Sequence, residues 1–321
     1  GTFPASSFNP TRLDCNQWVS VAKNAGAKYM ILVCKHHDGF CNWQTATTDY
    51  CVKSSPWKGG KGDVVAEFVV ACRKQGMKFG FYLSPWDRHE PKYKDKHAYD
   101  EFYAAQLTEL VTKYANPGEI YELWFDGAGS AGRVYDWTRF MEIVHKHQPN
   151  AMIFNMGDLT IRWVGNESGY APYPHWNVVE SKKADEFAFD GKTKADGSGD
   201  KWLPAECDVP IRHRHWFHHK GLWGIVYRKM LFKKDKLVEL YERSVGHGAN
   251  LLLNLAPTEE GLFNQTDVNR LGEAMAEVWR RYSKPLAETS GNGNEVVLKL
   301  PEKGQVNAVM IQEDILEGGE R

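Results

Sequence analysis

Residues 28–43 are KYMILVCKHHDGFCNW, and this stretch decides the fold class. It begins with a short, continuous apolar run that follows a helix-like segment, Asp14–Ala25. A strand that is apolar throughout, without alternation, is typical of a parallel sheet buried on both faces. Titratable residues, among them His36 and His37, come directly after the run. The stretch therefore predicts a buried parallel strand that delivers polar side chains to one edge of a sheet.

The same order of elements recurs along the chain. Helix-like spacing of apolar residues is followed by a short apolar run several more times. The predicted helices are 64–74, 97–114, 137–147 and 234–247, and the predicted strands are 77–84, 119–125, 151–156 and 250–257. Strands that alternate with helices of this length indicate right-handed βαβ units and a parallel sheet.

Two architectures fit this alternation, a (β/α)8-type barrel and an open doubly wound sheet. The loops after the predicted strands are rich in polar and aromatic residues: HHDGFCNW, PWDRHEP, DGAGSAG and GDLTIRWVGNES. In a barrel, such loops converge on one mouth, where active sites lie. No glycine-rich phosphate-binding motif follows any strand. We therefore predict an α/β fold with a (β/α)8-like (TIM-type) catalytic barrel over residues 1–285.

Two stretches depart from the repeat. Residues 170–219 are the longest stretch without regular periodicity, which is typical of a lid or a binding loop. In residues 286–321, NEVVLKL and QVNAVMI flank PEKG as two alternating strands flank a turn. We predict that this segment begins a small, incomplete all-β domain. We also expect residues to be missing at both ends of the chain.

Composition argues against several kinds of partner. The 321 residues include 40 Lys and Arg against 41 Asp and Glu, a formal net charge of −1. This balance gives no electrostatic reason to expect nucleic acid, and no apolar run approaches the about 20 residues of a membrane span. The six cysteines form no CxxC pair, so a zinc site or disulfide framework is not expected. Aromatic residues reach 13%, which suits either sugar stacking or a Trp-rich core.

Carboxylates placed after predicted strands suggest a hydrolase. Asp126 directly follows the apolar run ELWF, where a charge is costly unless it has partners or a chemical role. It is either a loop-capping residue or a nucleophile at the barrel mouth. Glu167, after the next predicted strand, and Glu206, in WLPAECD, are the candidate partners. Two carboxyl groups that face one cleft are the machinery of glycoside hydrolysis.

His36 and His37 suit sugar recognition. Neighbouring residues at a strand end point in different directions, so one ring can face the mouth while the other braces it. Neutral imidazoles donate and accept hydrogen bonds, as sugar hydroxyls require. A metal site and a Ser-His-Asp hydrolase are the alternatives, but no HExxH spacing and no GxSxG elbow is present. We expect neither a metal nor a cofactor.

The ordered set KHHDGF, FYLSPWDRH, ELWFDG, RWVGNE, LPAECD and NLLLNLAP resembles the α-L-fucosidases of glycoside hydrolase family 29, from Phe8 to Pro257. LPAECD and PWDRH are more similar to the subfamily restricted to α-1,3/1,4-fucosyl linkages. The resemblance implies a retaining exo-α-L-fucosidase that removes terminal L-fucose from a fucosylated oligosaccharide or glycoconjugate through a covalent intermediate, without a cofactor. It also implies a C-terminal β-sandwich and a secreted or periplasmic location.

The resemblance further implies roles for particular residues. Asp126 matches the nucleophile and Glu167 the acid/base, with Glu206 as the alternative acid or a substrate-binding residue. His36 and His37 match a pair that holds fucose hydroxyls. The remaining candidate substrate-binding residues are Trp124, at the C6 methyl group, Arg162 and Trp163, near the ring, and Trp43 and Trp86, in the predicted mouth loops. A catalytically silent carbohydrate-binding barrel and a barrel glycosidase for another deoxy sugar stay open as alternatives.

Overall fold

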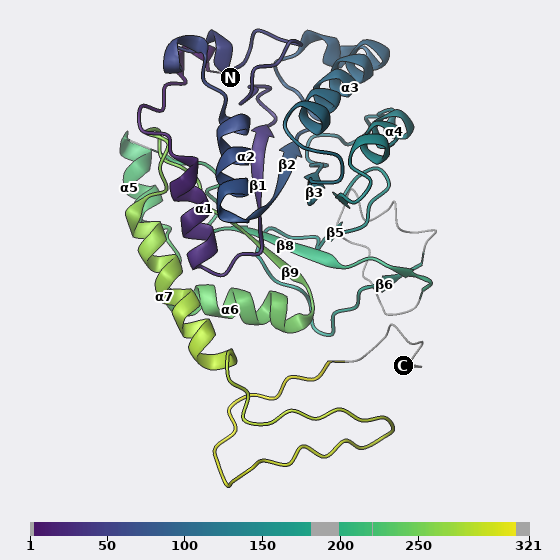
Figure 1. The fold of residues 1–321 in the computed structure, drawn as a ribbon, viewed down its shortest axis with the longest axis vertical. Helices are drawn as coiled ribbons and strands as arrows, with labels where there is room; N and C mark the ends of the chain where they lie inside the picture. Colours follow the sequence, from purple (N-terminus) through teal and green to yellow (C-terminus); the bar gives the residue numbers. More distant parts are fainter. Residues whose placement is uncertain (1–2, 181–198, 220, 313–321) are drawn as a thin grey trace.

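The computed structural model describes residues 3–180, 199–219 and 221–312, in which parallel strands are flanked by helices (Figure 1). The α-helices are α1 (Cys15–Asn24), α2 (Val64–Gln75), α3 (Lys96–Lys113), α4 (Trp137–His147), α5 (Gly221–Lys229), α6 (Lys234–Ser244) and α7 (Gln265–Tyr282). The strands are β1 (Tyr29–Lys35), β2 (Lys78–Leu83), β3 (Glu122–Trp124), β4 (Met152–Phe154), β5 (Arg162–Trp163), β6 (Val178–Val179), β7 (Lys201–Trp202), β8 (Ala205–Pro210) and β9 (Asn250–Asn254). Short 3₁₀-helices cover Ala5–Ser7, Val52–Ser54, Trp57–Gly60, Pro91–Lys94 and Val245–His247.

Two parallel sheets form the framework. One has the strand order β1-β2-β3-β4 and the other β5-β8-β9. A parallel bridge between Phe154 and Ile161 sets β5 beside β4 and in the same direction. The described residues add a small antiparallel ribbon of β6 and β7. The predicted alternation of helices with parallel strands is confirmed, and the fold is of the α/β class.

Aspartate side chains cap the N-termini of the helices that flank the first sheet. Asp14, Asp63, Asp95 and Asp136 each accept a hydrogen bond from a backbone N–H in the first turn of α1, α2, α3 and α4. Such a cap contributes about 1 kcal/mol, because it satisfies a donor that has no partner within the helix. The predicted starts of these helices are confirmed to within one residue.

The two faces of the first sheet have different neighbours. On the outer face, Phe79, Phe81 and Leu123 join a large buried core with residues of α1, α2, α3 and α4. On the inner face, Tyr82 of β2 and Trp124 of β3 pack with side chains of β1, β4, β5 and β9. The inner faces of both sheets therefore share one interior, and the strand ends that open onto it can place side chains from distant parts of the chain together.

The segment 170–219, predicted to be irregular, contains a buried strand. β8 is buried along its whole length and pairs with both β5 and β9. Its sequence AECDVP contains two acidic residues and a proline, which are depleted in strands, so the pattern did not reveal it. Residues 181–198 of the predicted lid lie outside the described residues.

Residues 283–312 leave α7 and project from the rest of the molecule as an extended segment (Figure 1). The described part of this segment contains no strand, although two were predicted around PEKG. Apolar side chains along it are exposed, among them Val297, Val309 and Ile311. Alternating residues form a stable strand only beside other strands, so the domain boundary at residue 286 stays a prediction.

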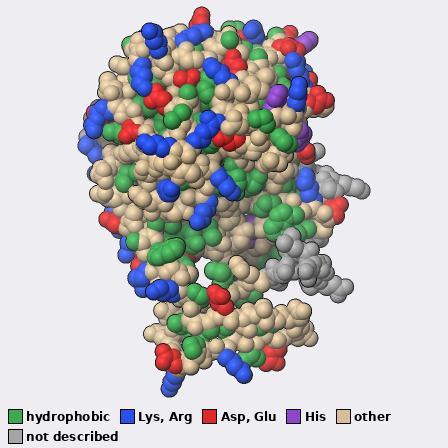
Figure 2. Space-filling view, in the orientation of Figure 1, with side chains coloured by type: hydrophobic (Ala, Val, Ile, Leu, Met, Phe, Trp, Pro, Cys, Tyr) green, Lys and Arg blue, Asp and Glu red, His purple; other side chains and the backbone are tan. Residues whose placement is uncertain are grey.

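The face seen in the space-filling view carries mixed charge. Figure 2 shows basic and acidic side chains interspersed over the visible face, in keeping with the net charge of −1. A mixed face has no extended field of one sign that would attract a polyanion. Within the described ranges, no helix combines the length and apolar character that crossing a bilayer requires.

Candidate active site

A break in the regular pairing of β1 aims His36 into the interior. The register between β1 and β2 shifts between Val33 and Lys35. Because side chains alternate along a strand, a shift of one residue exchanges its two faces. Lys35 therefore points outward to Tyr99 of α3, while the ring of His36 stacks on Tyr82 with centroids 5.6 Å apart.

The outward Lys35 braces the loops that follow β1 and β2. Its Nζ is fully buried and donates to Asp87 Oδ2 at 3.1 Å and to Gln106 Oε1 at 2.9 Å. Gly39 lies against this ion pair with a φ of 84°, and a Cβ there would come within 2.4 Å of Asp87 Oδ1. Only glycine accepts both the conformation and the contact. The loops with the histidines and with Trp86 are thus tied to each other.

Asp126 comes directly after β3 and faces the same interior. Its Oδ1 accepts a hydrogen bond from the backbone N–H of Ala128 at 2.8 Å, and its Oδ2 accepts one from the hydroxyl of Tyr82 at 2.7 Å. The side chain is 21% exposed, and its Oδ2 lies 3.4 Å from Nε2 of His37. The carboxylate is therefore held in one orientation while it stays accessible from outside.

The hydrogen bonds of His37 assign its tautomer. Nδ1 lies 2.7 Å from the Ser84 hydroxyl, which itself donates to the carbonyl oxygen of Trp86 at 2.7 Å. Because the hydroxyl proton is used there, Ser84 accepts from His37, and Nδ1 carries the ring proton. In the neutral ring, Nε2 then presents a lone pair toward Asp126.

Burial lowers the pKa of both histidines. Burial is the largest effect at His36, His37 adds to it and Asp126 opposes it, and the pKa of His36 falls to about 4. Burial also lowers the pKa of His37, against the opposing effect of Asp126. Both rings are therefore mainly neutral near pH 7. We call His36, His37 and Asp126 the His–His–Asp cluster; their donor atoms all lie within 4.8 Å of one another.

Two aromatic rings border this cluster. The ring of Trp86 lies beside His37 with centroids 4.9 Å apart. Gly129, at a φ of 72°, makes room for it, since a Cβ there would come within 2.0 Å of the indole. Phe217 is 51% exposed and meets the ring of His36 edge-on at 4.9 Å. Phe217 was not predicted, and the aromatic pair in RHRHWFHH was the available signal.

Trp124 forms the floor of this region. Its indole stacks between Tyr82, with centroids 5.2 Å apart, and Phe154, with centroids 4.0 Å apart. The residue is 8% exposed, so little of the indole is open to a ligand. Since Tyr82 also donates to Asp126, this stack connects the floor to the carboxylate. Tyr82 was not predicted as a site residue.

Glu206 lies beyond Trp124, away from solvent, and the structure corrects both roles predicted for it. The side chain is 0% exposed. Its Oε1 accepts from Trp124 Nε1 at 2.8 Å, and its Oε2 accepts from Asn250 Nδ2 at 2.6 Å and from the hydroxyl of Tyr29. A carboxyl group that is enclosed and fully engaged cannot contact a glycan or protonate it. Glu206 supports the indole instead.

A second carboxyl group accompanies Glu206. Glu122 lies two residues before Trp124 on β3 and is also 0% exposed. Burial, and then the neighbouring Glu206, raise the pKa of Glu122 well above its usual value. Hydrogen bonds to Glu206 favour its charged form. Burial raises the pKa of Glu206 as well, against these hydrogen bonds, so a proton shared by the pair is held more readily by Glu122.

Glu167 lies in the exposed loop after β5, at the edge where β3 also ends. Trp163 of β5 faces the interior and donates Nε1–H to Asp208 Oδ1 at 2.7 Å. Burial raises the pKa of Asp208 to about 8; the bond from Trp163 opposes this, and Glu167 adds to it. This effect indicates that Glu167 lies near Asp208. Asp208 was not predicted as a site residue.

Trp43 and Arg162 do not face the site, which corrects their prediction as substrate-binding residues. Trp43 is 0% exposed in the outer core and donates Nε1–H to Glu109 of α3 at 2.8 Å. Arg162 precedes Trp163, so alternation along β5 turns it to the outer face. There it is buried and donates to the carbonyl oxygen of Trp176 at 3.0 Å.

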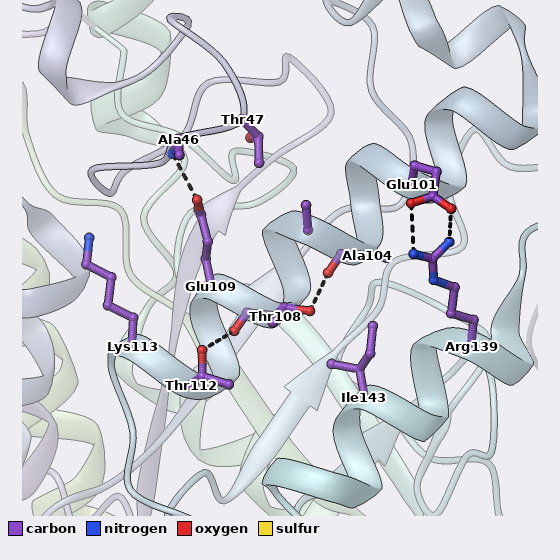
Figure 3. A pocket seen from close by; sticks show the side chains of 11 residues that line it. Ala46, Thr47, Glu101, Ala104, Thr108, Glu109, Thr112, Lys113, Arg139 and Ile143 are labelled. Carbon is purple, nitrogen blue, oxygen red and sulfur yellow. Dashed lines mark hydrogen bonds and ion pairs between the residues drawn. The ribbon is translucent and has the colours of Figure 1, made fainter.

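A surface groove of about 490 Å³ lies elsewhere, between α3, α4 and the loop at Ala46 (Figure 3). In Figure 3, Glu101 pairs with Arg139, and Glu109 accepts from the N–H of Ala46. These polar groups already satisfy one another. None of the candidate residues lines the groove, so it is separate from the site described above.

Comparison with known proteins gives a consistent family. The family model described as Alpha-L-fucosidase matches residues 4–282. Alpha-L-fucosidase 1 of Arabidopsis thaliana is 42% identical over 273 residues, which are 84% of this chain and 52% of the relative. Tissue alpha-L-fucosidase of Homo sapiens is 27% identical over 279 residues, 81% of this chain and 51% of the relative. The chain thus spans about half the length of these relatives.

Solved structures agree with this match. A glycoside hydrolase 29 family member from an unknown rumen bacterium superposes with a TM-score of 0.77 at 36% identity, covering 90% of this chain and 54% of that one. A GH29 fucosidase of Ruminococcus gnavus, in complex with fucose, gives a TM-score of 0.77 at 33% identity, with coverage of 90% and 63%. The sequence motifs, the site and both comparisons converge, and the chain belongs to the α-L-fucosidase family.

Proposed function

We propose that the protein is a retaining exo-α-L-fucosidase that hydrolyses terminal α-1,3/1,4-linked L-fucose from glycans. The observation that carries the proposal is the His–His–Asp cluster, in which an oriented, accessible carboxylate lies beside two neutral imidazoles in a member of the α-L-fucosidase family. The Ruminococcus gnavus relative was solved in complex with fucose, which supports fucose as the sugar that this protein releases. The natural substrate would be a fucosylated oligosaccharide or glycoconjugate.

Asp126 is the proposed nucleophile. One of its oxygens attacks C1 of fucose, a C1–O bond forms, and the glycosidic C1–O bond breaks. The hydroxyl of Tyr82 and the N–H of Ala128 hold the carboxylate so that it approaches C1 in one orientation. His36 and His37 accept hydrogen bonds from sugar hydroxyls, and Trp124 offers an apolar edge to the C6 methyl group.

Glu167 is the proposed acid/base. It protonates the departing glycosidic oxygen and then takes a proton from the water that attacks C1 of the intermediate. Its exposed loop leaves room for the rest of the glycan, in contrast to the enclosed Glu206. Retention requires the carboxyl groups of Asp126 and Glu167 to lie about 5–5.5 Å apart.

The architecture belongs to the same proposal. We infer that the two parallel sheets are parts of one (β/α)8-like barrel over residues 1–285, which the shared interior and the bridge between β4 and β5 support. Residues 286–321 would begin a C-terminal β-sandwich. A secreted or periplasmic location follows from a glycan substrate.

Hydrolysis of a nitrophenyl α-L-fucoside, with the matching α-galactoside as control, tests the activity. We expect turnover of the fucoside alone, and a loss of about 10³-fold or more in kcat/KM for Asp126→Ala. If Asp126→Ala were as active as the wild-type protein, Asp126 would not be the nucleophile. Turnover of the galactoside instead would favour a glycosidase for another sugar, and sugar binding without turnover would favour a silent carbohydrate-binding barrel.

Azide separates the roles of the carboxyl groups. Azide should restore turnover of an activated fucoside by Glu167→Ala and give the α-fucosyl azide, whereas Asp126→Ala should give the β-fucosyl azide. Glu206→Ala should show no rescue. Release of fucose from a Lewis trisaccharide, compared with an α-1,2-linked substrate, tests the proposed linkage preference.

A further inference from the structure

Two acceptor atoms of the His–His–Asp cluster face each other. Nε2 of His37 presents a lone pair, because Nδ1 holds the proton and donates it to Ser84. Asp126 Oδ2 lies 3.4 Å away. Two acceptors that face each other at this distance repel unless a donor or a cation lies between them. In the proposed reaction, a sugar hydroxyl supplies that donor.

The same spacing suits a metal ion. Two ligands bound to Zn²⁺ at about 2.0–2.1 Å in tetrahedral geometry lie about 3.3–3.5 Å apart. The separation of His37 Nε2 and Asp126 Oδ2, 3.4 Å, is that of such a ligand pair. His36 completes the group, and the donor atoms of all three residues lie within 4.8 Å of one another. Two imidazoles and one carboxylate are a common ligand set for zinc and neighbouring metals.

The surroundings of His37 also match a metal ligand. Ligating histidines generally donate their second ring N–H to a fixed acceptor, which orients the ring and holds its tautomer. Here Ser84 is that acceptor, and its own hydroxyl is fixed by the carbonyl oxygen of Trp86. The lone pair of Nε2 is therefore aimed at the cluster before any ligand arrives.

We propose that the cluster binds one zinc-like divalent ion and that this ion excludes the sugar. The ion would occupy the lone pairs of His36, His37 and Asp126 that otherwise receive sugar hydroxyls or attack C1, so the two ligands compete. The metal is an inhibitor here, since hydrolysis by two carboxyl groups does not need one. The competition rests on the proposed function, whereas the binding of the ion does not.

Calorimetric titration of the protein with ZnCl₂ tests the site directly. We expect one ion per chain, and loss of this binding in His37→Gln and in Asp126→Asn. Ser84→Ala keeps all three ligands and should weaken binding roughly 10–100-fold, as removal of an orienting partner does. His213→Gln is the matched control, because His213 lies in the histidine-rich stretch 213–219, outside the cluster.

Each outcome decides the proposal. Unchanged binding in His37→Gln, or loss of binding in His213→Gln, would place the ion elsewhere and overturn it. No binding to the wild-type protein would overturn it as well. Circular dichroism of each variant, compared with wild type, separates loss of a ligand from loss of the fold.

Kinetics test the exclusion of sugar. At a Zn²⁺ concentration of ten times its dissociation constant, apparent KM for the aryl fucoside should rise about elevenfold with kcat unchanged. Saturating L-fucose should in turn abolish the calorimetric signal. A fall in kcat at constant KM would contradict competition. Turnover in buffer with a chelator tests the fucosidase activity separately, so its failure and that of the metal site are distinguishable.

Discussion

Two carboxylates near the same interior differ in how completely they are satisfied: Asp126 with its neighbour His37, which we call the open group, and Glu206 with its donors, which we call the enclosed group. In the open group, Asp126 is partly exposed, and its neighbour His37 keeps a lone pair without a donor. In the enclosed group, Glu206 is 0% exposed and accepts hydrogen bonds from Tyr29, Trp124 and Asn250. Trp124 lies between the two groups.

The difference indicates what each group does. Burying a charge is costly, and a carboxylate that has no solvent contact must find its partners within the protein. Glu206 accepts hydrogen bonds from such partners, so it contributes to the fold and to the position of Trp124. The open group keeps acceptors that only an incoming molecule can satisfy. An accessible acceptor that has no donor in the protein therefore marks the ligand site more clearly than the presence of acidic residues does.

Removal of the two carboxylates should separate stability from function. Glu206→Ala would leave the Nε1–H of Trp124 and the hydroxyl of Tyr29 without the oxygens that accept from them, each worth about 1–3 kcal/mol, so we expect a loss of roughly 3 kcal/mol or more in the free energy of unfolding. Asp126→Ala, at a partly exposed position, should change it by no more than about 1 kcal/mol. Urea denaturation of both variants measures this.

Similar losses for the two variants would contradict the division into an open and an enclosed group. A change in the urea slope would show that the comparison is affected by a different unfolded state, so midpoints and slopes should both be compared. Glu206→Gln is a useful control, because it keeps the volume and one acceptor oxygen and should lose less than Glu206→Ala.

Trp124→Phe should have a smaller effect that bears on both groups. The variant keeps a ring between Tyr82 and Phe154 but removes the Nε1–H that Glu206 accepts. We expect a loss of about 1–2 kcal/mol in the free energy of unfolding and a rise in KM for an aryl fucoside. Trp163→Phe is the matched control, since its indole donates to Asp208 instead.

Stability unchanged in Trp124→Phe would mean that Glu206 does not depend on the indole. A lower stability with unchanged KM would mean that Trp124 only supports the fold. The prediction requires both quantities to change together, because the same ring is held from one side and presents an edge on the other.

The sequence predicted the first sheet better than the second. The run YMILVC is apolar throughout and the strand before Asp126 is mostly apolar, so their burial could be inferred from composition alone. β5 has only two residues, and β8 carries Glu206 and Asp208 on its inner face, so neither has an apolar pattern. Helix α7 was also not predicted, although its caps and spacing are ordinary.

The site was predictable where polar residues directly follow an apolar run. His36, His37 and Asp126 were identified in this way, and the structure brings them together. The enclosure of Glu206 was not predictable, because its partners Tyr29 and Asn250 lie 177 and 44 residues away in the sequence. The direction of a side chain also depends on register, which is why Arg162 was taken for a site residue.

Asp208 extends the comparison, because it lies on β8 two residues after the enclosed Glu206, and both Glu206 and the exposed Glu167 contribute to its raised pKa. Burial raises its pKa from 3.8 to about 8, so the folded protein binds a proton there that the unfolded chain releases. The contribution of Asp208 to the free energy of unfolding is therefore most favourable below about pH 4. It falls as pH rises toward about 8, by up to about 1.4 kcal/mol per pH unit.

Asp208→Asn should remove that slope. Urea midpoints measured from about pH 5 to about pH 8 should show the variant gaining stability relative to wild type as pH rises. Glu122 also has a raised pKa, but it is present in both proteins and cancels in the difference. A constant difference across this range would mean that Asp208 is already ionised in the folded state, and thus that Trp163 and its surroundings compensate a buried charge as fully as the partners of Glu206 do.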